Sequence, residues 1–206
     1  MNRPKIRFKG YGDDWEQRKL NEIADKVSEK NKNNEFSELF TNSAEQGIIS
    51  QKDYFDREIV NDENLNGYYI VRNDDFIYNP RISVTAPVGP INRNKLGCCG
   101  VMSPLYYVFR VEKQSDGILH FLDYYFKSNM WHDFMFKNGN SGARSDRFSI
   151  SDSTFSLMPI LYPQKEEEQL NIGQVFINME KLMRTESIKL SKFRSMKQSL
   201  LQKMFI

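Results

Sequence analysis

The sequence predicts a mixed α+β globular domain followed by a long C-terminal α-helix of the coiled-coil type. The main evidence is a change of composition at Pro163. Gly, Pro and Asn punctuate the residues before it, whereas the stretch from Gln164 to Ile206 contains no Pro and a single Gly, Gly173. Short segments with strand or helix spacing precede this point, and a heptad-like apolar pattern follows it. We therefore expect a globular domain over residues 1–163 and a helix over residues 164–206.

Apolar spacing predicts two helices and three strands in the globular part. Residues 14–27 form the first expected helix, because their apolar side chains fall on one face, namely Trp15, Leu20, Ile23, Ala24 and Val27. The other expected elements are strands over 68–78 and 101–111, a helix over 118–136 and a strand over 156–162. Polar loops are expected at 41–47, 79–95 and 138–152.

The C-terminal segment is typical of one long amphipathic helix. Pro163 marks its start, and three glutamates at 166–168 suit the positive end of the helix dipole. Two rows of apolar residues at heptad spacing form a seam, which Glu186 and Lys197 interrupt. The expected interface residues of this seam are Ile172, Phe176, Met179, Met183, Leu190, Phe193, Leu200 and Met204. A helix of about 40 residues extends roughly 60 Å, so part of the seam should meet another helix. The alternative is a helix that folds back on its own domain.

Composition excludes several classes of protein. The 29 Lys and Arg residues nearly balance the 27 Asp and Glu residues, so an anionic partner must bind a local patch. No apolar stretch is long enough to span a membrane, and Met1–Lys5 lacks the apolar core of a secretory signal. The two cysteines, Cys98 and Cys99, are adjacent and form neither a disulfide framework nor a zinc site. We expect a soluble cytoplasmic protein with no membrane contact, metal or cofactor.

A search for catalytic motifs favours a protein that is not an enzyme. The chain has two histidines, His120 and His132, and both fall within the expected helix over 118–136. It contains no phosphate-binding loop, no dinucleotide-binding glycine pattern and no nucleophile elbow. Asn79-Pro80-Arg81 approaches the Asn-Pro-Pro-aromatic motif of adenine methyltransferases, but it lacks the second proline and the aromatic ring.

The expected loops carry groups that suit polyanion recognition. Residues 76–111 contain four basic residues and no acidic one, and the loop over 138–152 combines glycines with two arginines. Arginine and lysine bind phosphates or guanine, whereas asparagine can pair with adenine. The candidate DNA-binding residues are Asn42, Ser43, Asn79, Arg81, Arg93, Lys95, Arg144 and Arg147. Ordinary solvated loops are the alternative for each segment taken alone.

The order of several short motifs resembles one known family. The N-terminal motifs are Pro4–Phe8 and Trp15–Ile23, the central ones are Asn42-Ser43 with Gly47-Ile48, Asp75–Pro80 and Ser103–Phe109, and the C-terminal ones are Phe155–Pro163, Glu168-Gln169 with Ile172, and Lys197–Phe205. Together they cover nearly the whole chain and resemble the specificity (S) subunits of type I restriction-modification systems. A family subunit carries two target-recognition domains, each followed by a long helix, whereas this chain has one of each. It resembles half a subunit.

The resemblance implies a function that composition alone does not. In the family each recognition domain reads one part of a bipartite site in double-stranded DNA. The two helices pack antiparallel, hold the domains apart, and dock the methyltransferase (modification) subunits and the restriction subunit. We therefore expect a non-catalytic DNA-recognition half-subunit whose helix pairs with a second recognition domain's helix or with its own copy. The alternative is a coiled-coil adaptor or decoy of a restriction complex that does not itself bind DNA.

Overall fold

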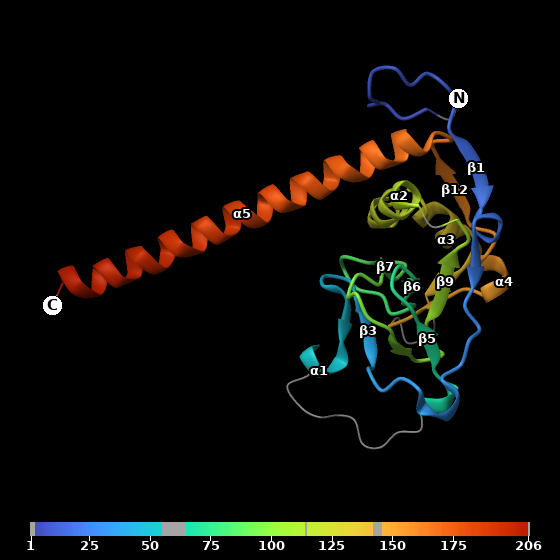
Figure 1. The fold of residues 1–206 in the computed structure, drawn as a ribbon, viewed down its shortest axis with the longest axis horizontal. Helices are drawn as coiled ribbons and strands as arrows, with labels where there is room; N and C mark the ends of the chain where they lie inside the picture. The colour runs from blue at the N-terminus through green and yellow to red at the C-terminus, as the bar shows by residue number, and fades with distance from the viewer. Residues whose placement is uncertain (1–2, 55–64, 114, 142–145, 206) are drawn as a thin grey trace.

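A computed structural model describes residues 3–54, 65–113, 115–141 and 146–205. Its globular body contains short antiparallel sheets and packed helices, and the long helix α5 (Glu166–Met204) projects from one side of this body (Figure 1). This arrangement confirms the expected mixed α+β fold with a long C-terminal helix. No helix in the described ranges is both long and apolar enough to cross a membrane.

The centre of the body is an antiparallel sheet with strand order β2 (Ala24–Lys26), β9 (Tyr107–Val111), β6 (Phe76–Tyr78), β7 (Ile91–Arg93). Its side chains alternate between two buried faces, as strand geometry requires. Phe76 and Phe109 stack on one face with their ring centroids 5.5 Å apart and pack towards helix α2 (Asp116–Lys127). Ile77 and Val108 belong to a second apolar cluster on the opposite face.

Smaller two-stranded sheets surround the central one. β5 (Tyr69–Val71) pairs with β8 (Gly100–Met102), and β3 (Phe40–Ser43) pairs with β4 (Gly47–Ser50), which leads into the single turn α1 (Gln51–Tyr54). β1 (Glu16–Lys19) pairs with β12 (Pro159–Tyr162) immediately before α5. β10 (Asn140–Ser141) and β11 (Phe148–Ser149) follow helix α3 (His132–Asn138), and the single turn α4 (Asp152–Phe155) precedes β12.

The expected helix over 14–27 is wrong. This segment forms β1, a 3-10 turn (Leu20–Glu22) and β2. The backbone pairs with partners that are distant in sequence, since Glu16 faces Tyr162 and Ala24 faces Val111. Leu20, Ile23 and Ala24 still enter the core, but they do so from the 3-10 turn, its C-terminal end and β2 rather than from one α-helix. Tertiary pairing has overridden a helical pattern of the kind that short segments often show.

The expected helix over 118–136 and two of the expected strands are each divided. Ser128 is extended and ends α2, and Trp131 then turns into the core, where its Nε1 donates to the Phe126 carbonyl at 3.1 Å. A turn around Asp74, whose φ is +68°, separates β5 from β6 within 68–78. Ser103–Tyr106 separates β8 from β9 within 101–111. The strand expected over 156–162 begins only at Pro159.

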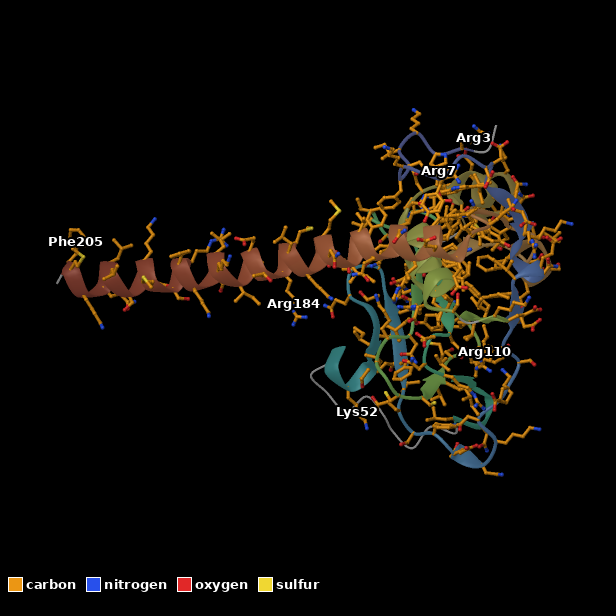
Figure 2. The ribbon with its side chains drawn as sticks, turned by 45° about the horizontal axis from the view of Figure 1, so that its top comes forward. Arg3, Arg7, Lys52, Arg110, Arg184 and Phe205 are labelled. Atoms are coloured by element: carbon orange, nitrogen blue, oxygen red, sulfur yellow. The ribbon has the colours of Figure 1, made fainter. Side chains whose placement is uncertain are left out.

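Helix α5 docks on the body only through its first half. It runs along α2, with the rings of Tyr124 and Phe176 stacked 4.9 Å apart, and Ile172 packs on the main core. Every residue from 181 to 205 is exposed. Figure 2 shows Arg184 and Phe205 on the part that has left the body. The alternative of a helix that folds back on its own domain is therefore wrong for this distal half.

Gly173 brings α5 close to α2, and we expect Gly173→Ala to destabilise the protein. A Cβ at this position would lie 2.5 Å from Cβ of His120 and 3.3 Å from its carbonyl carbon. An exposed helical Gly→Ala change normally stabilises by about 1 kcal/mol, whereas overpacking costs about 1–3 kcal/mol. Thermal denaturation should therefore show a lower Tm for Gly173→Ala. Gly12→Ala is the control, because a Cβ there meets nothing within 4 Å. A higher Tm for Gly173→Ala would contradict the close packing.

Candidate nucleic-acid interface

A groove with a volume of about 670 Å³ lies between the β3–β4 hairpin and the loop over 79–90. Its wall includes hairpin residues 41–46, loop residues 79–85, and Arg147 from the segment before β11. We call this feature the hairpin groove. It brings together two of the expected polar loops and one arginine of the third. Of the candidate residues, it gathers Asn42, Ser43, Asn79, Arg81 and Arg147.

Three asparagines hold the hairpin and the loop together. Asn42 is 2% exposed, and its Nδ2 donates to the Ile77 carbonyl at 2.7 Å. Its Oδ1 accepts from Nδ2 of Asn92 at 2.7 Å. Nδ2 of Asn79 donates to the Asn42 carbonyl at 2.8 Å, while its Oδ1 accepts from the Arg81 backbone N–H at 2.9 Å. These amides are already engaged within the protein, so they shape the groove and position Arg81.

Hydrogen bonds also fix both edges of the groove. In the hairpin turn, Oγ of Ser43 accepts from the backbone N–H groups of Glu45 and Gln46. Below the loop, the hydroxyl of Tyr78 donates to the Val88 carbonyl at 2.8 Å, and burial raises the pKa of Tyr78. This phenol therefore stays protonated at neutral pH and remains a donor that anchors the loop.

Arg81 and Arg147 lie directly opposite one another across an antiparallel β-bridge. Two backbone hydrogen bonds flank the bridge, from Ile82 N–H to the Asp146 carbonyl at 3.1 Å and from Phe148 N–H to the Pro80 carbonyl at 2.7 Å. Both arginines are exposed, and neither forms an ion pair within the described parts of the chain. Like charges in facing positions repel each other, so this pair is suited to an anion that binds between them.

The structure places two other candidate residues outside the hairpin groove. Arg93 is 8% exposed and lies 3.7 Å from Asp74, and Lys95 forms an ion pair with Asp123 at 2.9 Å. Both line a neighbouring cavity of about 750 Å³ between the hairpin and helices α2 and α3. Arg144 lies outside the described residues. These candidates stay predictions, since Arg93 is buried and the exposed Lys95 is engaged by Asp123.

Three groove residues, Gln51, Leu105 and Tyr106, lie outside the loops expected from the sequence. Leu105 and Tyr106 line the hairpin groove, and Tyr106 is hydrogen-bonded to Thr41 with 3.3 Å between their hydroxyl oxygens. The sequence pattern predicts a continuous strand over 101–111 that includes Leu105 and Tyr106, whereas in the structure they lie in the turn between β8 and β9. Ser103-Pro104 inside that segment is the signal that predicts a turn there.

The distal half of α5 is the other candidate interaction surface. Six of the expected interface residues lie on it or at its start, and each is at least half exposed: Met179, Met183, Leu190, Phe193, Leu200 and Met204. Phe176 and Ile172, the first two residues of the seam, instead contact the body of the same chain. An exposed apolar stripe of this kind is typical of a protein–protein interface, even though Glu186 and Lys197 interrupt it.

A family model of the type I restriction modification DNA specificity domain matches residues 12–192. The chain belongs to this family. The match spans the globular body from residue 12 and helix α5 as far as residue 192, so it includes the hairpin groove and the first part of the apolar stripe, up to Leu190. The family is described as a DNA specificity domain, which is the role expected of a non-catalytic DNA-recognition subunit. The described residues contain no group of three or more His, Cys, Asp or Glu side chains arranged to hold a metal ion.

A solved structure shares the fold of this specificity domain. It comes from work on complex assembly and conformational transition of the type I R-M system, with a TM-score of 0.57, 13% identity, and coverage of 98% of this chain and 50% of that chain. The HsdS subunit from Thermoanaerobacter tengcongensis gives a TM-score of 0.48 and 16% identity, with coverage of 98% of this chain and 47% of its own. The specificity domain thus spans about half the length of both structures. No curated protein sequence matches it.

Proposed function

We propose that the chain acts as half of a type I specificity subunit and binds one part of a bipartite DNA site through the hairpin groove. The observation that carries this proposal is the bridge between Arg81 and Arg147, which places two exposed arginines opposite each other in the groove wall, neither with an ion-pair partner among the described residues. Guanidinium groups bind phosphate oxygens, or the O6 and N7 atoms of guanine, with two parallel hydrogen bonds. A duplex supplies both kinds of acceptor.

The proposal divides the chain into two working parts. Residues 1–163 would hold the DNA, with Arg81 and Arg147 as direct contacts and with Ser43 at the groove edge. Asn42 and Asn79 would act through the hydrogen bonds that shape the groove, while Arg93, Lys95 and Arg144 stay secondary candidates. Residues 164–206 would act as a spacer and a docking surface.

The partners in this proposal bind α5. The uncovered apolar stripe suits an antiparallel helix, either from a second recognition domain or from another copy of the chain, and two-fold symmetry would then present two DNA-binding surfaces. The methyltransferase and restriction subunits would assemble on this pair in a cytoplasmic complex. One of the structural neighbours was determined in a study of the assembly of a type I system, which supports this proposal.

A second candidate function rests on α5 alone. The exposed stripe would also serve a coiled-coil adaptor or decoy that occupies a restriction complex without binding DNA. Salt-titrated binding of fluorescent duplexes to the purified chain separates the two functions. A specificity half-subunit should bind duplex DNA with an affinity that falls steeply as salt rises, whereas an adaptor should show no binding at any salt concentration. Methylation mapping in cells that carry the chain and its modification partner would then give the recognised sequence.

The purified chain alone should neither methylate nor cleave DNA. This expectation follows from its membership of a specificity-domain family and from the absence of catalytic motifs in its sequence. The measurement is transfer of a labelled methyl group from S-adenosylmethionine to duplex DNA, together with an electrophoretic cleavage assay. The same assays after addition of the modification subunit provide the positive control. Methyl transfer by a preparation free of other subunits would contradict the prediction.

A further inference from the structure

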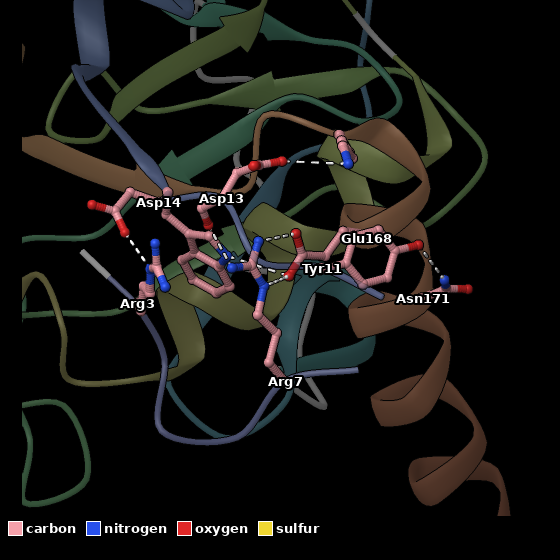
Figure 3. A network of polar contacts seen from close by, with 9 residues as sticks. Arg3, Arg7, Tyr11, Asp13, Asp14, Glu168 and Asn171 are labelled. Atoms are coloured by element: carbon pink, nitrogen blue, oxygen red, sulfur yellow. Dashed lines mark hydrogen bonds and ion pairs between the residues drawn. The ribbon is translucent and has the colours of Figure 1, made fainter. Parts of the chain in front are cut away.

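Residues 3–15, which we call the N-terminal segment, contact the first turn of α5 through a buried ion pair. Nε and Nη2 of Arg7 donate to the two carboxylate oxygens of Glu168 at 2.6 and 2.8 Å, and Nε1 of Trp15 lies 3.4 Å from one of them (Figure 3). The Glu168 side chain is 1% exposed and that of Arg7 is 14% exposed. A two-point contact with a buried carboxylate fixes direction as well as distance. Arg7 therefore orients the beginning of the helix.

Neighbouring contacts extend this attachment along the same segment. Nδ2 of Asn171 donates to the hydroxyl of Tyr11 at 3.2 Å, and Nζ of Lys165 lies 3.3 Å from a carboxylate oxygen of Asp13 (Figure 3). Nη1 of Arg7 also donates to the Asp13 carbonyl at 2.5 Å, which holds the segment in its bend. The N-terminal segment thus contacts α5 at more than one residue.

Helix α2 holds α5 at a second place, farther along its axis. Nζ of Lys127 donates to Glu180 at 2.9 Å, and the hydroxyl of Tyr124 donates to the same carboxylate at 3.0 Å. Burial opposes ionisation of Glu180, but Lys127 outweighs it and holds its pKa below the ordinary value. The contact is therefore charged at neutral pH. Because these side chains are partly exposed, Lys127 should orient the helix less strongly than Arg7.

The two contacts restrict different tilts of the helix. Glu168 and Glu180 are about 18 Å apart along the axis and about 120° apart around it, given a rise of 1.5 Å and 3.6 residues per turn. Beyond Glu180 the helix leaves the body and continues for about 35 Å without support. A tilt of about 10° at Glu180 would displace the C-terminal end of the helix by about 6 Å. This displacement exceeds the distance of about 3.4 Å between successive base pairs.

We propose that Arg7 and Lys127 are positioning residues: their contacts with Glu168 and Glu180 hold the first half of α5 from two sides and set the direction of the helix. We call these two contacts the clamp. If α5 joins two recognition domains, as the proposed function holds, the same clamp sets the separation between the two parts of the DNA site. The clamp itself does not depend on DNA binding. Its two consequences can therefore be measured separately.

The first experiment measures the direction of α5 in the full chain. Spin labels are attached to exposed Cys98, in a Cys99→Ser background, and to a cysteine introduced by Ser199→Cys near the end of the helix. Labelled protein is mixed with excess unlabelled protein so that pulsed electron paramagnetic resonance reports distances within one chain. Wild type should give one narrow distribution. Arg7→Ala should broaden it by about 6 Å, the displacement expected for a tilt of about 10°, and Lys127→Ala should broaden it less.

Matched variants separate positioning from loss of folding. Arg3→Ala removes an exposed ion pair with Asp14 from the same N-terminal segment without touching α5, and it should leave the distribution narrow. Arg7→Lys keeps the charge but loses the two-point contact, so it should broaden the distribution less than Arg7→Ala. If Arg7→Ala fails to fold, Arg7→Lys and Lys127→Ala still decide the result. A folded Arg7→Ala and Lys127→Ala double variant with a wild-type distribution would overturn the proposal.

The second experiment measures spacing preference on DNA. Duplexes carry the mapped site with its natural spacer or with a spacer that is two base pairs longer. Wild type should bind the duplex with the natural spacer roughly tenfold more tightly, because the longer spacer fits only if the DNA is deformed. In the Arg7→Ala and Lys127→Ala double variant this preference should fall to about twofold. An unchanged preference in the double variant would overturn the link between the clamp and spacing. A wild type that binds no duplex would overturn the proposed function, while the spin-label distances would still decide the clamp.

Discussion

If the chain self-associates through α5, as proposed above, Phe193→Asp is expected to convert the dimer into a monomer. Phe193 is 66% exposed on the half of α5 that lies beyond the globular body, where every described residue from 181 to 205 is exposed. Burial of a phenylalanine side chain contributes about 1.5–3 kcal/mol, and a two-fold interface contains the residue twice. The change should therefore raise the dissociation constant of the dimer by roughly 10²–10⁴-fold. Sedimentation velocity over a range of protein concentrations measures this shift.

The control for this experiment adds the same charge elsewhere on α5. Ser195→Asp places a carboxylate two residues further along, which is a different face of the helix and outside the apolar seam. It should leave the sedimentation profile unchanged. A wild-type chain that sediments as a monomer at tens of micromolar would refute self-association. In that case the seam of α5 would have to bind a different recognition domain or a modification subunit.

The long helix could be predicted because its evidence is local and repeated. Heptad spacing, the absence of proline and a glutamate-rich first turn all act within a few residues, and together they define α5 without knowledge of the rest of the fold. The segment over 14–27 shows the opposite case. Its apolar spacing is also helical, but pairing with Tyr162 and Val111 makes it extended. Such long-range pairing leaves no signal in the segment's own sequence.

The site could be predicted at the level of loops but not of side chains. Acid-free and glycine-rich segments indicated which loops carry polar groups, and the structure brings parts of three of them to the hairpin groove. Residues of the same type differ in burial, and this difference decides which of them can contact a ligand. Asn42 is buried with its amide engaged, Arg93 lies beside Asp74, and Arg81 and Arg147 remain exposed. The bridge between Arg81 and Arg147 joins segments that are far apart in the sequence, so no local sequence motif could predict this pairing.

Alanine at both Arg81 and Arg147 is expected to remove most of the specific DNA affinity. The bridge places Arg81 and Arg147 opposite each other in the groove wall, so neighbouring phosphates or base edges of one duplex can accept hydrogen bonds from both. An arginine that reads a base edge should cost about 1–3 kcal/mol on the recognised sequence and relax discrimination at one position. An arginine that contacts only phosphate should weaken all sequences alike and lower the salt slope by about one unit. Salt-titrated anisotropy on the mapped site and on a scrambled duplex distinguishes these two roles for each single variant.

Because the two positive charges repel each other in the free protein, their removal should leave stability unchanged or slightly higher. A loss of DNA affinity without a loss of Tm would therefore identify the arginines as contacts with the ligand rather than supports of the fold. Arg18→Ala is the matched control, since Arg18 is an exposed arginine on β1 that pairs with Glu16 and does not line the groove. It should bind both duplexes as wild type does. If the Arg81 and Arg147 variants also bind both duplexes like wild type, the hairpin groove is not the DNA-binding surface, and the neighbouring cavity that Arg93 and Lys95 line becomes the next surface to test.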